Sequence, residues 1–314
     1  MGLTSWRGQR VRVGIVGICG FGRFHAESFE KIGWQVAAAA DRSERLHEVA
    51  AQFGARPYMS YQELLESEEL DALSISLPPR LHPEVVEAAV AKGLPVLCEK
   101  PVAPDARGAE KLLAQVGEEA RVAVGFSFRY NTTFQRLREL IAAGELGRIT
   151  VIHARKWWGT RTPWRLEEGG GAVFVKDIHY YDLIPWLLGE EASSVCAIGG
   201  ANYHDAAVED SYQLLLGFPS GAAFHLDSAW WTLDTSANHF EVVGTKARAF
   251  VDGDNLRIEG EGARVEEVGG EPMLLAEIRA FANWVEGNGP KPPGLVEAAR
   301  ANRLAQRVVD ALRS

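Results

Sequence analysis

The sequence is poor in cysteine and lacks the short motifs that hold metal ions. Its three cysteines, Cys19, Cys98 and Cys196, are scattered along the chain and form no C-x-x-C pair. We therefore expect neither a disulfide framework nor a structural zinc site. An H-E-x-x-H motif is also missing, and the histidines are isolated in sequence, so no metal is expected.

A surplus of basic residues and a long apolar run are missing as well. The 33 Lys and Arg face 42 Asp and Glu, which gives a formal charge of -9. This balance argues against nucleic acid or an anionic membrane as a partner. No run could span a bilayer, and the N-terminal stretch MGLTSWRGQR lacks the apolar core of a signal peptide. We therefore expect a cytoplasmic protein that acts on small molecules.

What the sequence does contain is a glycine-rich loop, VRVGIVGICGFGRFH over residues 11–25, between an apolar run and a helix-like segment. In the dinucleotide-binding pattern G-x-G-x-x-G, the glycines allow a tight turn, close approach to phosphate and close helix packing. Cys19 stands at the middle glycine position. The helix N-terminus offers unpaired N–H groups to an anion. We expect a pyrophosphate, slightly shifted, at Gly17, Cys19, Gly20, Phe21 and Gly22; the alternative is a glycine-rich turn in another α/β domain.

Asp41 and Arg42 bear on the choice of cofactor. Asp41 ends the apolar run QVAAAA, where a carboxylate accepts hydrogen bonds from the adenosine ribose and repels a 2′-phosphate. This favours NAD, whereas Arg42 could accommodate the phosphate of NADP. Leu77, Pro78 and His82 follow the next strand, where backbone approaches the nicotinamide ribose. Helix capping explains His82 nearly as well.

Two domains are expected from the length of 314 residues and from a change in pattern. Over residues 1–126, short apolar runs alternate with amphipathic segments, which predicts a parallel, doubly wound Rossmann sheet of the α/β class. Over residues 127–314, longer runs with polar alternation predict an α+β domain built on a mainly antiparallel open sheet. Helices are expected there at about 172–188, 274–286 and 296–313.

The run PVLCEKP places Glu99 and Lys100 at the carboxyl end of a parallel strand, the edge at which open α/β sheets bind ligands. Lys100 precedes a proline, so we expect its backbone to be extended. The bond between the two residues is a candidate for the cis form. Both residues are expected near the cofactor. The alternative is a solvated loop lysine.

Together, these features resemble the glucose-fructose oxidoreductase, inositol dehydrogenase and rhizopine catabolism (Gfo/Idh/MocA) family. The resemblance covers nearly the whole chain, including PPRLHPEVVEAAVAKGLPVLCEKPVA, GFSFRYN and GGGAVFVKDIHYYDL. It implies an NAD- or NADP-dependent dehydrogenase or reductase acting on sugars, cyclitols or related polyols. By this resemblance, Lys100 is the catalytic lysine and His179 its partner from the second domain.

The segment before His179 departs from the family pattern, because Val175 stands where an aspartate is usual. On a helix, residues three or four apart share a face, so Asp177 points away from His179. Lys176 is expected to reach the same pocket as a third catalytic group, and Asp182 could orient the imidazole. A histidine on such a face is otherwise a structural residue.

Aromatic residues precede this segment in RKWWGTRTPWRLEEGGG. Aromatic faces suit a sugar ring, so Trp158 and Trp164 are expected to bind substrate together with Lys100, Lys176 and His179. Packing in a core or a subunit interface is the competing explanation.

The expected reaction interconverts a secondary alcohol and a ketone on a sugar, cyclitol or related polyol. A base is then needed within reach of the hydroxyl proton, and Lys100 with His179 are the candidates. One alternative is an NAD-dependent glycoside hydrolase that oxidises its substrate transiently. Another is a non-catalytic sugar- or nucleotide-binding regulator. A homodimer or homotetramer through the C-terminal sheet is expected.

Overall fold

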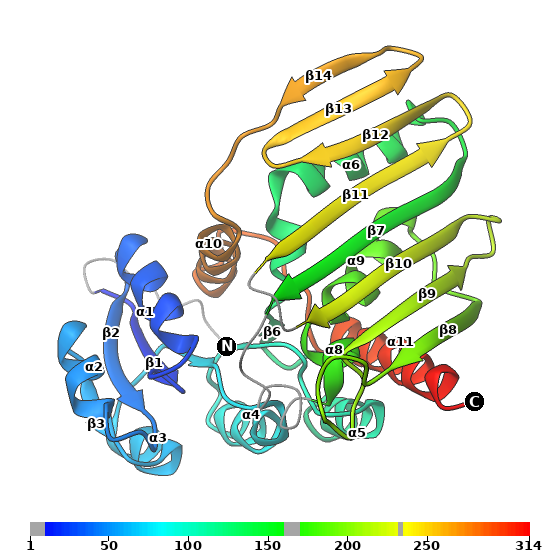
Figure 1. Cartoon of the computed structure of the whole chain (residues 1–314). Helices are drawn as coiled ribbons and strands as arrows, with labels where there is room; N and C mark the ends of the chain where they lie inside the picture. The colour runs from blue at the N-terminus through cyan, green and yellow to red at the C-terminus, as the bar shows by residue number, and fades with distance from the viewer. Residues whose placement is uncertain (1–9, 160–169, 232–234) are drawn as a thin grey trace. The chain divides into compact units, whose positions relative to one another are not determined.

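A computed structural model of the chain describes residues 10–159, 170–231 and 235–314 (Figure 1). The chain divides into two compact units, and each is built from two separate stretches of sequence. Met1–Phe126 and Pro272–Ala299 form unit 1, and Ser127–Glu271 and Arg300–Ser314 form unit 2. The expected second domain of residues 127–314 therefore needs a correction, because residues 272–299 return to the first unit.

Unit 1 contains a six-stranded sheet in the order β3-β2-β1-β4-β5-β6, with every neighbouring pair parallel. This is the predicted doubly wound α/β arrangement, in which strand order reverses beside β1. The edge strand β3 was not predicted, since it has three residues and includes a proline. The strands are β1 (Arg12–Val16), β2 (Gln35–Ala40), β3 (Arg56–Tyr58), β4 (Ala72–Ile75), β5 (Val96–Cys98) and β6 (Val122–Val124).

Helices connect these strands, and side-chain caps start two of them. Ser60 accepts a hydrogen bond from the Glu63 amide at the start of α3, and Asp105 accepts one from the Gly108 amide at the start of α5. The helices are α1 (Gly22–Lys31), α2 (Leu46–Gln52), α3 (Tyr61–Ser67), α4 (His82–Ala91) and α5 (Ala106–Val116), with a 3₁₀ turn η1 (Pro79–Leu81). From the later stretch come α10 (Met273–Val285) and the start of α11 (Leu295–Leu312).

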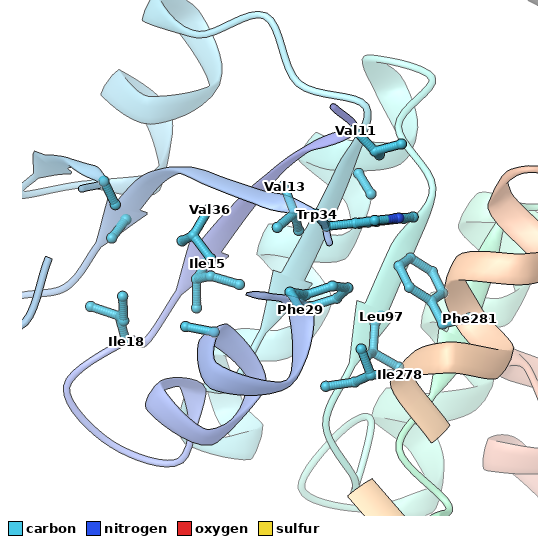
Figure 2. Packing of buried hydrophobic residues seen from close by; sticks show 14 of the residues in the cluster. Val11, Val13, Ile15, Ile18, Phe29, Trp34, Val36, Leu97, Ile278 and Phe281 are labelled. Atoms are coloured by element: carbon cyan, nitrogen blue, oxygen red, sulfur yellow. The ribbon is translucent and has the colours of Figure 1, made fainter. Parts of the chain in front are cut away.

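Helix α10 joins unit 1 because its apolar face covers α1. Phe281 and Ile278 are fully buried, and the Phe281 ring lies 6.3 Å from Phe29 of α1 and 6.1 Å from Trp34 (Figure 2). Phe29 and Trp34 stack at 5.3 Å, and the Trp34 indole donates to Glu286. The core of unit 1 is thus completed by a segment that follows most of unit 2 in the sequence.

Unit 2 contains an eight-stranded sheet in the order β14-β13-β12-β11-β7-β10-β9-β8 (Figure 1). Every neighbouring pair is antiparallel except β7 with β10. The predicted mainly antiparallel sheet is therefore confirmed. The strands are β7 (Ile149–Gly159), β8 (Ser194–Gly200), β9 (Ser211–Gly217), β10 (Ala223–Trp231), β11 (Ser236–Gly244), β12 (Ala247–Asp252), β13 (Asn255–Gly260) and β14 (Arg264–Glu267).

The helices of unit 2 include α6 (Thr132–Ala142), α8 (Gly171–Val175) and α9 (Ile178–Leu188), with the 3₁₀ turn η2 (Ser127–Tyr130) before α6. The single helix predicted over 172–188 is wrong, because the chain leaves the helix at Lys176 and Asp177. The Asp177 amide bonds to the Ala172 carbonyl, five residues back, and its buried carboxylate accepts from Tyr212 and Ser228 on the sheet.

The two faces of the unit 2 sheet differ sharply. The face toward α6 and α9 is apolar and buried, with Ile152, Leu214 and Phe224 fully enclosed. The opposite face, called here the outward face, carries exposed apolar side chains, including Ile198 (75% exposed) and Leu215 (49%). Among the described residues, no helix has the length and hydropathy needed to cross a membrane.

Candidate functional site

The glycine loop joins β1 to α1 as predicted, and two of its glycines are required by the backbone. Gly17 has φ +91°, and a Cβ there would lie 2.3 Å from the Ser76 carbonyl oxygen. A Cβ on Gly22 would lie 2.5 Å from the Gly17 carbonyl oxygen. At Gly20 the surroundings are open, since the nearest atom is 3.9 Å away. The local fold therefore does not explain Gly20, whereas close approach of a ligand would.

The start of α1 has the features of an anion site. Its first turn receives no hydrogen bond from a capping side chain. Backbone N–H groups at a helix N-terminus carry partial positive charge and attract phosphate. The open surface at Gly20 lies directly before this turn. These residues fit a dinucleotide pyrophosphate, and Cys19 does not close the loop.

Asp41 stands at the end of β2, where it reaches back to the loop. Its carboxylate accepts one hydrogen bond from the Cys19 amide at 2.9 Å and another from the Ser43 amide at 2.9 Å. The contact fixes the loop at the residue that replaces the usual glycine. Burial and the Asp41 charge raise the pKa of the Cys19 thiol. Arg42 is exposed next to it.

His82 begins α4, after β4, and is buried. Only 1% of its surface is exposed, and its ring nitrogens contact the carbonyls of Pro101 (2.8 Å) and Leu77 (2.7 Å). Burial lowers the pKa of His82, while the two carbonyls act in the opposite direction. Both ring nitrogens are engaged with backbone, and the expected place of His82 near the nicotinamide ribose stays a prediction. His82 ties the turn at Leu77 and Pro78 to the segment after β5.

Lys100 follows β5 at the carboxyl end of the parallel sheet, and its peptide bond to Pro101 is cis. Next to it, Glu99 contacts His25 of α1 at 3.1 Å, and His25 also bonds Ser74 of β4 at 2.8 Å. Burial opposes ionisation of Glu99. The hydrogen bond from His25 and the charges of His25 and Lys100 outweigh it, so the pKa of Glu99 is lowered.

A second buried carboxyl group, Glu277 of α10, belongs to the same neighbourhood. A Cβ placed on Gly125 would lie 2.8 Å from Glu99 Oε1 and 3.3 Å from Glu277 Oε1. Both Glu277 oxygens are buried without a hydrogen-bond partner. Burial and the Glu99 charge raise the pKa of Glu277 well above its usual range, although Lys100 opposes this. Two neighbouring carboxyl groups thus have pKa values shifted in opposite directions.

In unit 2, His179 lies on α9 with its ring stacked on Phe128 of η2 at 4.5 Å and 14°. Asp182, one turn further along α9, accepts two hydrogen bonds from Arg129 at 2.7 and 2.5 Å. The Asp182 carboxylate therefore binds the Arg129 guanidinium, and its suggested role in orienting His179 stays a prediction. The stack on Phe128 holds the plane of the His179 imidazole.

Lys176 and Lys156 bring two cations to this part of unit 2. Lys176 is 4% exposed, and its Nζ donates to the Lys156 carbonyl at 3.0 Å and lies 3.8 Å from Asp177 Oδ2. Burial lowers the pKa of both lysines, whereas the charge of Asp177 acts against this. Lys176 is thus buried and holds backbone, and its expected catalytic contact stays a prediction.

The lysine that faces the aromatic side chains is Lys156, which the sequence did not single out. Its Nζ lies 6.0 Å from the Phe128 ring centroid and 5.4 Å from that of Trp158. Trp158, at the end of β7, is 49% exposed, so its ring is accessible to a substrate. The signal that could have found Lys156 is strand alternation, which puts residues 152, 154, 156 and 158 on one face. Trp164 lies outside the described residues.

Family comparisons match both halves of the chain. Residues 11–126 match the model of an oxidoreductase family with an NAD-binding Rossmann fold, named GFO/IDH/MocA. Residues 134–250 match the model of the C-terminal domain of the same family. Together the two models span most of the sequence in the order of the two units.

Several characterised proteins are similar to the chain. An inositol 2-dehydrogenase of Leifsonia xyli is 31% identical over 59% of this chain and 56% of its own length. The rhizopine catabolism protein MocA of Rhizobium meliloti is 27% identical over 96% of this chain and 95% of its own. Among solved structures, the UDP-N-acetylglucosamine 3-dehydrogenase GnnA of Acidithiobacillus ferrooxidans is 26% identical, with a TM-score of 0.85 over 97% of this chain and 98% of that one.

Proposed function

Because the chain belongs to the Gfo/Idh/MocA oxidoreductase family, we propose that it is a nicotinamide-dependent dehydrogenase that oxidises a secondary alcohol of a polyol or sugar. The observation that carries this proposal is the carboxyl edge of the parallel sheet. There the open glycine loop and the uncapped start of α1 follow β1, and Lys100 follows β5, with β4 between the two strands. This edge is where such sheets bind nucleotides.

The proposed cofactor is NAD. The Gly17–Gly22 loop and the first turn of α1 hold its pyrophosphate, and Asp41 holds the adenosine ribose. Asp41 already bonds two amides, and each carboxylate oxygen can still accept from a hydroxyl. When bound, the nicotinamide supplies the hydride acceptor. Use of NADP through the exposed Arg42 is the alternative.

The proposed chemistry of the chain's own residues is proton transfer. Oxidation of a carbinol releases its hydroxyl proton as hydride departs, so a base must receive that proton. We assign this task to Lys100 and His179 together. Phe128 holds the imidazole plane of His179, and Glu99, anchored by His25, lies directly before Lys100 in the chain.

Substrate recognition is assigned to the aromatic and cationic groups of unit 2. The exposed face of Trp158 suits the C–H face of a sugar or cyclitol ring, and Lys156 beside it donates to ring hydroxyls. The Lys176 ammonium group donates a hydrogen bond to the Lys156 carbonyl and thereby holds the backbone that carries the Lys156 side chain. Inositol is the first substrate to test, since several relatives carry the name inositol 2-dehydrogenase.

The outward face of the unit 2 sheet is proposed to bind a second copy of the chain. Ile198, Leu215 and Val265 expose apolar side chains on this face, with 49–75% of their surface accessible. Ile198 and Leu215 lie on the neighbouring strands β8 and β9, and adjacent exposed apolar side chains are typical of subunit contacts.

The test is an absorbance assay for reduced nicotinamide, with NAD or NADP and a panel of inositols, hexoses and their glycosides. We expect reduction of NAD with at least one cyclitol or sugar, in proportion to ketone formed. Hydrolysis of a glycoside without net reduction would instead indicate the transient-oxidation reaction. Calorimetry that finds no binding of either nucleotide would contradict the proposal altogether.

A further inference from the structure

Four ligand-type side chains gather on the outward face of the unit 2 sheet. In the sheet register, His153 of β7 pairs with His225 of β10 on one side and with Glu241 of β11 on the other. Residues that pair across neighbouring strands share a face. His239 precedes Glu241 by two residues and therefore points the same way. Three adjacent strands thus bring together residues that are far apart in sequence.

The spacing of three of these groups differs from that of hydrogen-bonded pairs. Glu241 Oε1 lies 3.6 Å from His153 Nδ1 and 3.7 Å from His239 Nε2. One atom from each residue lies within 4.8 Å of the others. Such distances exceed a hydrogen bond. They approach the separation of about 3.3 Å between ligands arranged tetrahedrally at 2.0–2.1 Å from a zinc ion.

We propose that His153, His239 and Glu241 bind a divalent transition-metal ion of the zinc class, with the remaining coordination positions filled by water. Two imidazoles and a carboxylate favour zinc, nickel, copper or iron over magnesium and calcium, which prefer oxygen. The three ligands come from one sheet, whose hydrogen bonds fix the strands. Small side-chain rotations bring the three atoms to coordination distance.

Neighbouring side chains hold the ligands in place. The His225 ring stacks on His153 at 4.9 Å and 23°, and His225 Nε2 contacts Gln213 at 3.1 Å. His239 packs edge-on against both His153 and Phe250. Contacts of this kind orient metal ligands and tune the affinity of the site.

The proposed metal site is distinct from the groups assigned to substrate. Alternation along β7 sends Lys156 and Trp158 to the face opposite His153. The ion is therefore assigned no part in the proposed oxidation. Its expected effect is to link β7 to β11 near the middle of the sheet, which stabilises unit 2 through binding to the folded state alone.

The test is titration of the untagged full chain, freed of metal by a chelator, with zinc in a calorimeter and with cobalt in a spectrophotometer. We expect one ion per chain and the visible absorption of a cobalt centre with nitrogen and oxygen ligands. His153→Ala, His239→Ala and Glu241→Gln should each weaken zinc binding by at least about tenfold, because loss of outer partners alone costs that much. His225→Ala should weaken binding less than these ligand variants do.

His47→Ala, at an exposed histidine of α2, is the matched control and should bind zinc like the wild type. Circular dichroism without metal reports whether each variant folds, and Glu241→Gln keeps shape and volume should a histidine variant fail. Zinc affinity that is unchanged from the wild type in all three ligand variants, or absent from the wild type, would overturn the proposal.

Discussion

At the scale of the residue, the proposed chemistry depends on whether Lys100 and His179 act together. Replacing either by alanine should lower the rate of hydride transfer about 10²–10⁴-fold, because a positioned base contributes that much. Single-turnover reduction of NAD at saturating substrate measures this. The exposed Lys111→Ala should leave the rate unchanged.

The double variant tests the pairing itself. Groups that act as a unit show strongly non-additive effects, so Lys100→Ala combined with His179→Ala should be little slower than the slower single variant. Fully multiplicative losses would mean that the two residues serve separate steps.

The buried acid Glu277 predicts a pH dependence of stability. Its raised pKa means that the folded chain keeps this proton at pH values where the unfolded chain has lost it. The free energy of unfolding therefore falls as pH rises above about 4.3, the ordinary value of a glutamate, by up to about 1.4 kcal/mol per pH unit. Glu277→Gln should remove this contribution in urea unfolding between weakly acidic and neutral pH.

Glu119→Gln, at an exposed position of unit 1, is the control and should keep the wild-type pH slope. Parallel stability curves for the Glu277→Gln variant and the wild type would show that Glu277 is ionised in the folded protein.

Substitutions at Gly17 and Gly20 distinguish a glycine that folding requires from a glycine that cofactor binding requires. Gly17→Ala meets the Ser76 carbonyl in a left-handed backbone conformation and should cost about 1–3 kcal/mol of stability. Gly20→Ala has open space, so its unfolding free energy should stay within about 0.5 kcal/mol of wild type. Calorimetry should nevertheless find weaker NAD binding for Gly20→Ala. Unchanged affinity would place the pyrophosphate elsewhere.

At the scale of the element, helix α10 is expected to be a main support of unit 1. Phe281 is fully buried against Phe29 and Trp34, so Phe281→Ala should lower the free energy of unfolding by about 3–5 kcal/mol. Met59→Ala, whose side chain is 54% exposed, should change it by less than about 0.5 kcal/mol. Chemical unfolding followed by tryptophan fluorescence, with Trp34 in this core, compares the two.

Elements were predictable from sequence where periodicity was strong. The runs that became β1, β2 and β10 are continuous and apolar or regularly alternating, and each was found. The short, polar strands β3 and β14 carry too little pattern to separate them from loops. The break between α8 and α9 was hidden, because it depends on Asp177 bonding to Tyr212 and Ser228, residues from later strands.

The residues of the candidate site likewise fall into those that could be identified from the sequence and those that could not. The positions of Gly17, Asp41 and Lys100 at strand ends could be predicted, because they follow from local order along the chain. Glu277 was not, since it reaches Glu99 only through the packing of α10, which is a tertiary contact. Lys156 was missed as well, although strand alternation places it on the same face as Trp158.

At the scale of the whole molecule, the outward face of the unit 2 sheet predicts self-association. Ile198 lies on this face with 75% of its surface exposed, so Ile198→Asp should shift the protein toward monomer in analytical ultracentrifugation. Met59→Asp, at an exposed position of unit 1, should not. A wild type that is monomeric at all concentrations would contradict the proposed contact.

The return of residues 272–299 to unit 1 has a consequence for synthesis. A nascent chain that has emerged only to residue 271 holds Phe29 and Trp34 without the helix that covers them. Unit 1 is therefore completed only after residues 272–299 have been made, and unit 2 only after residues 300–314. Chains that stop before residue 272 should accordingly be removed by proteases.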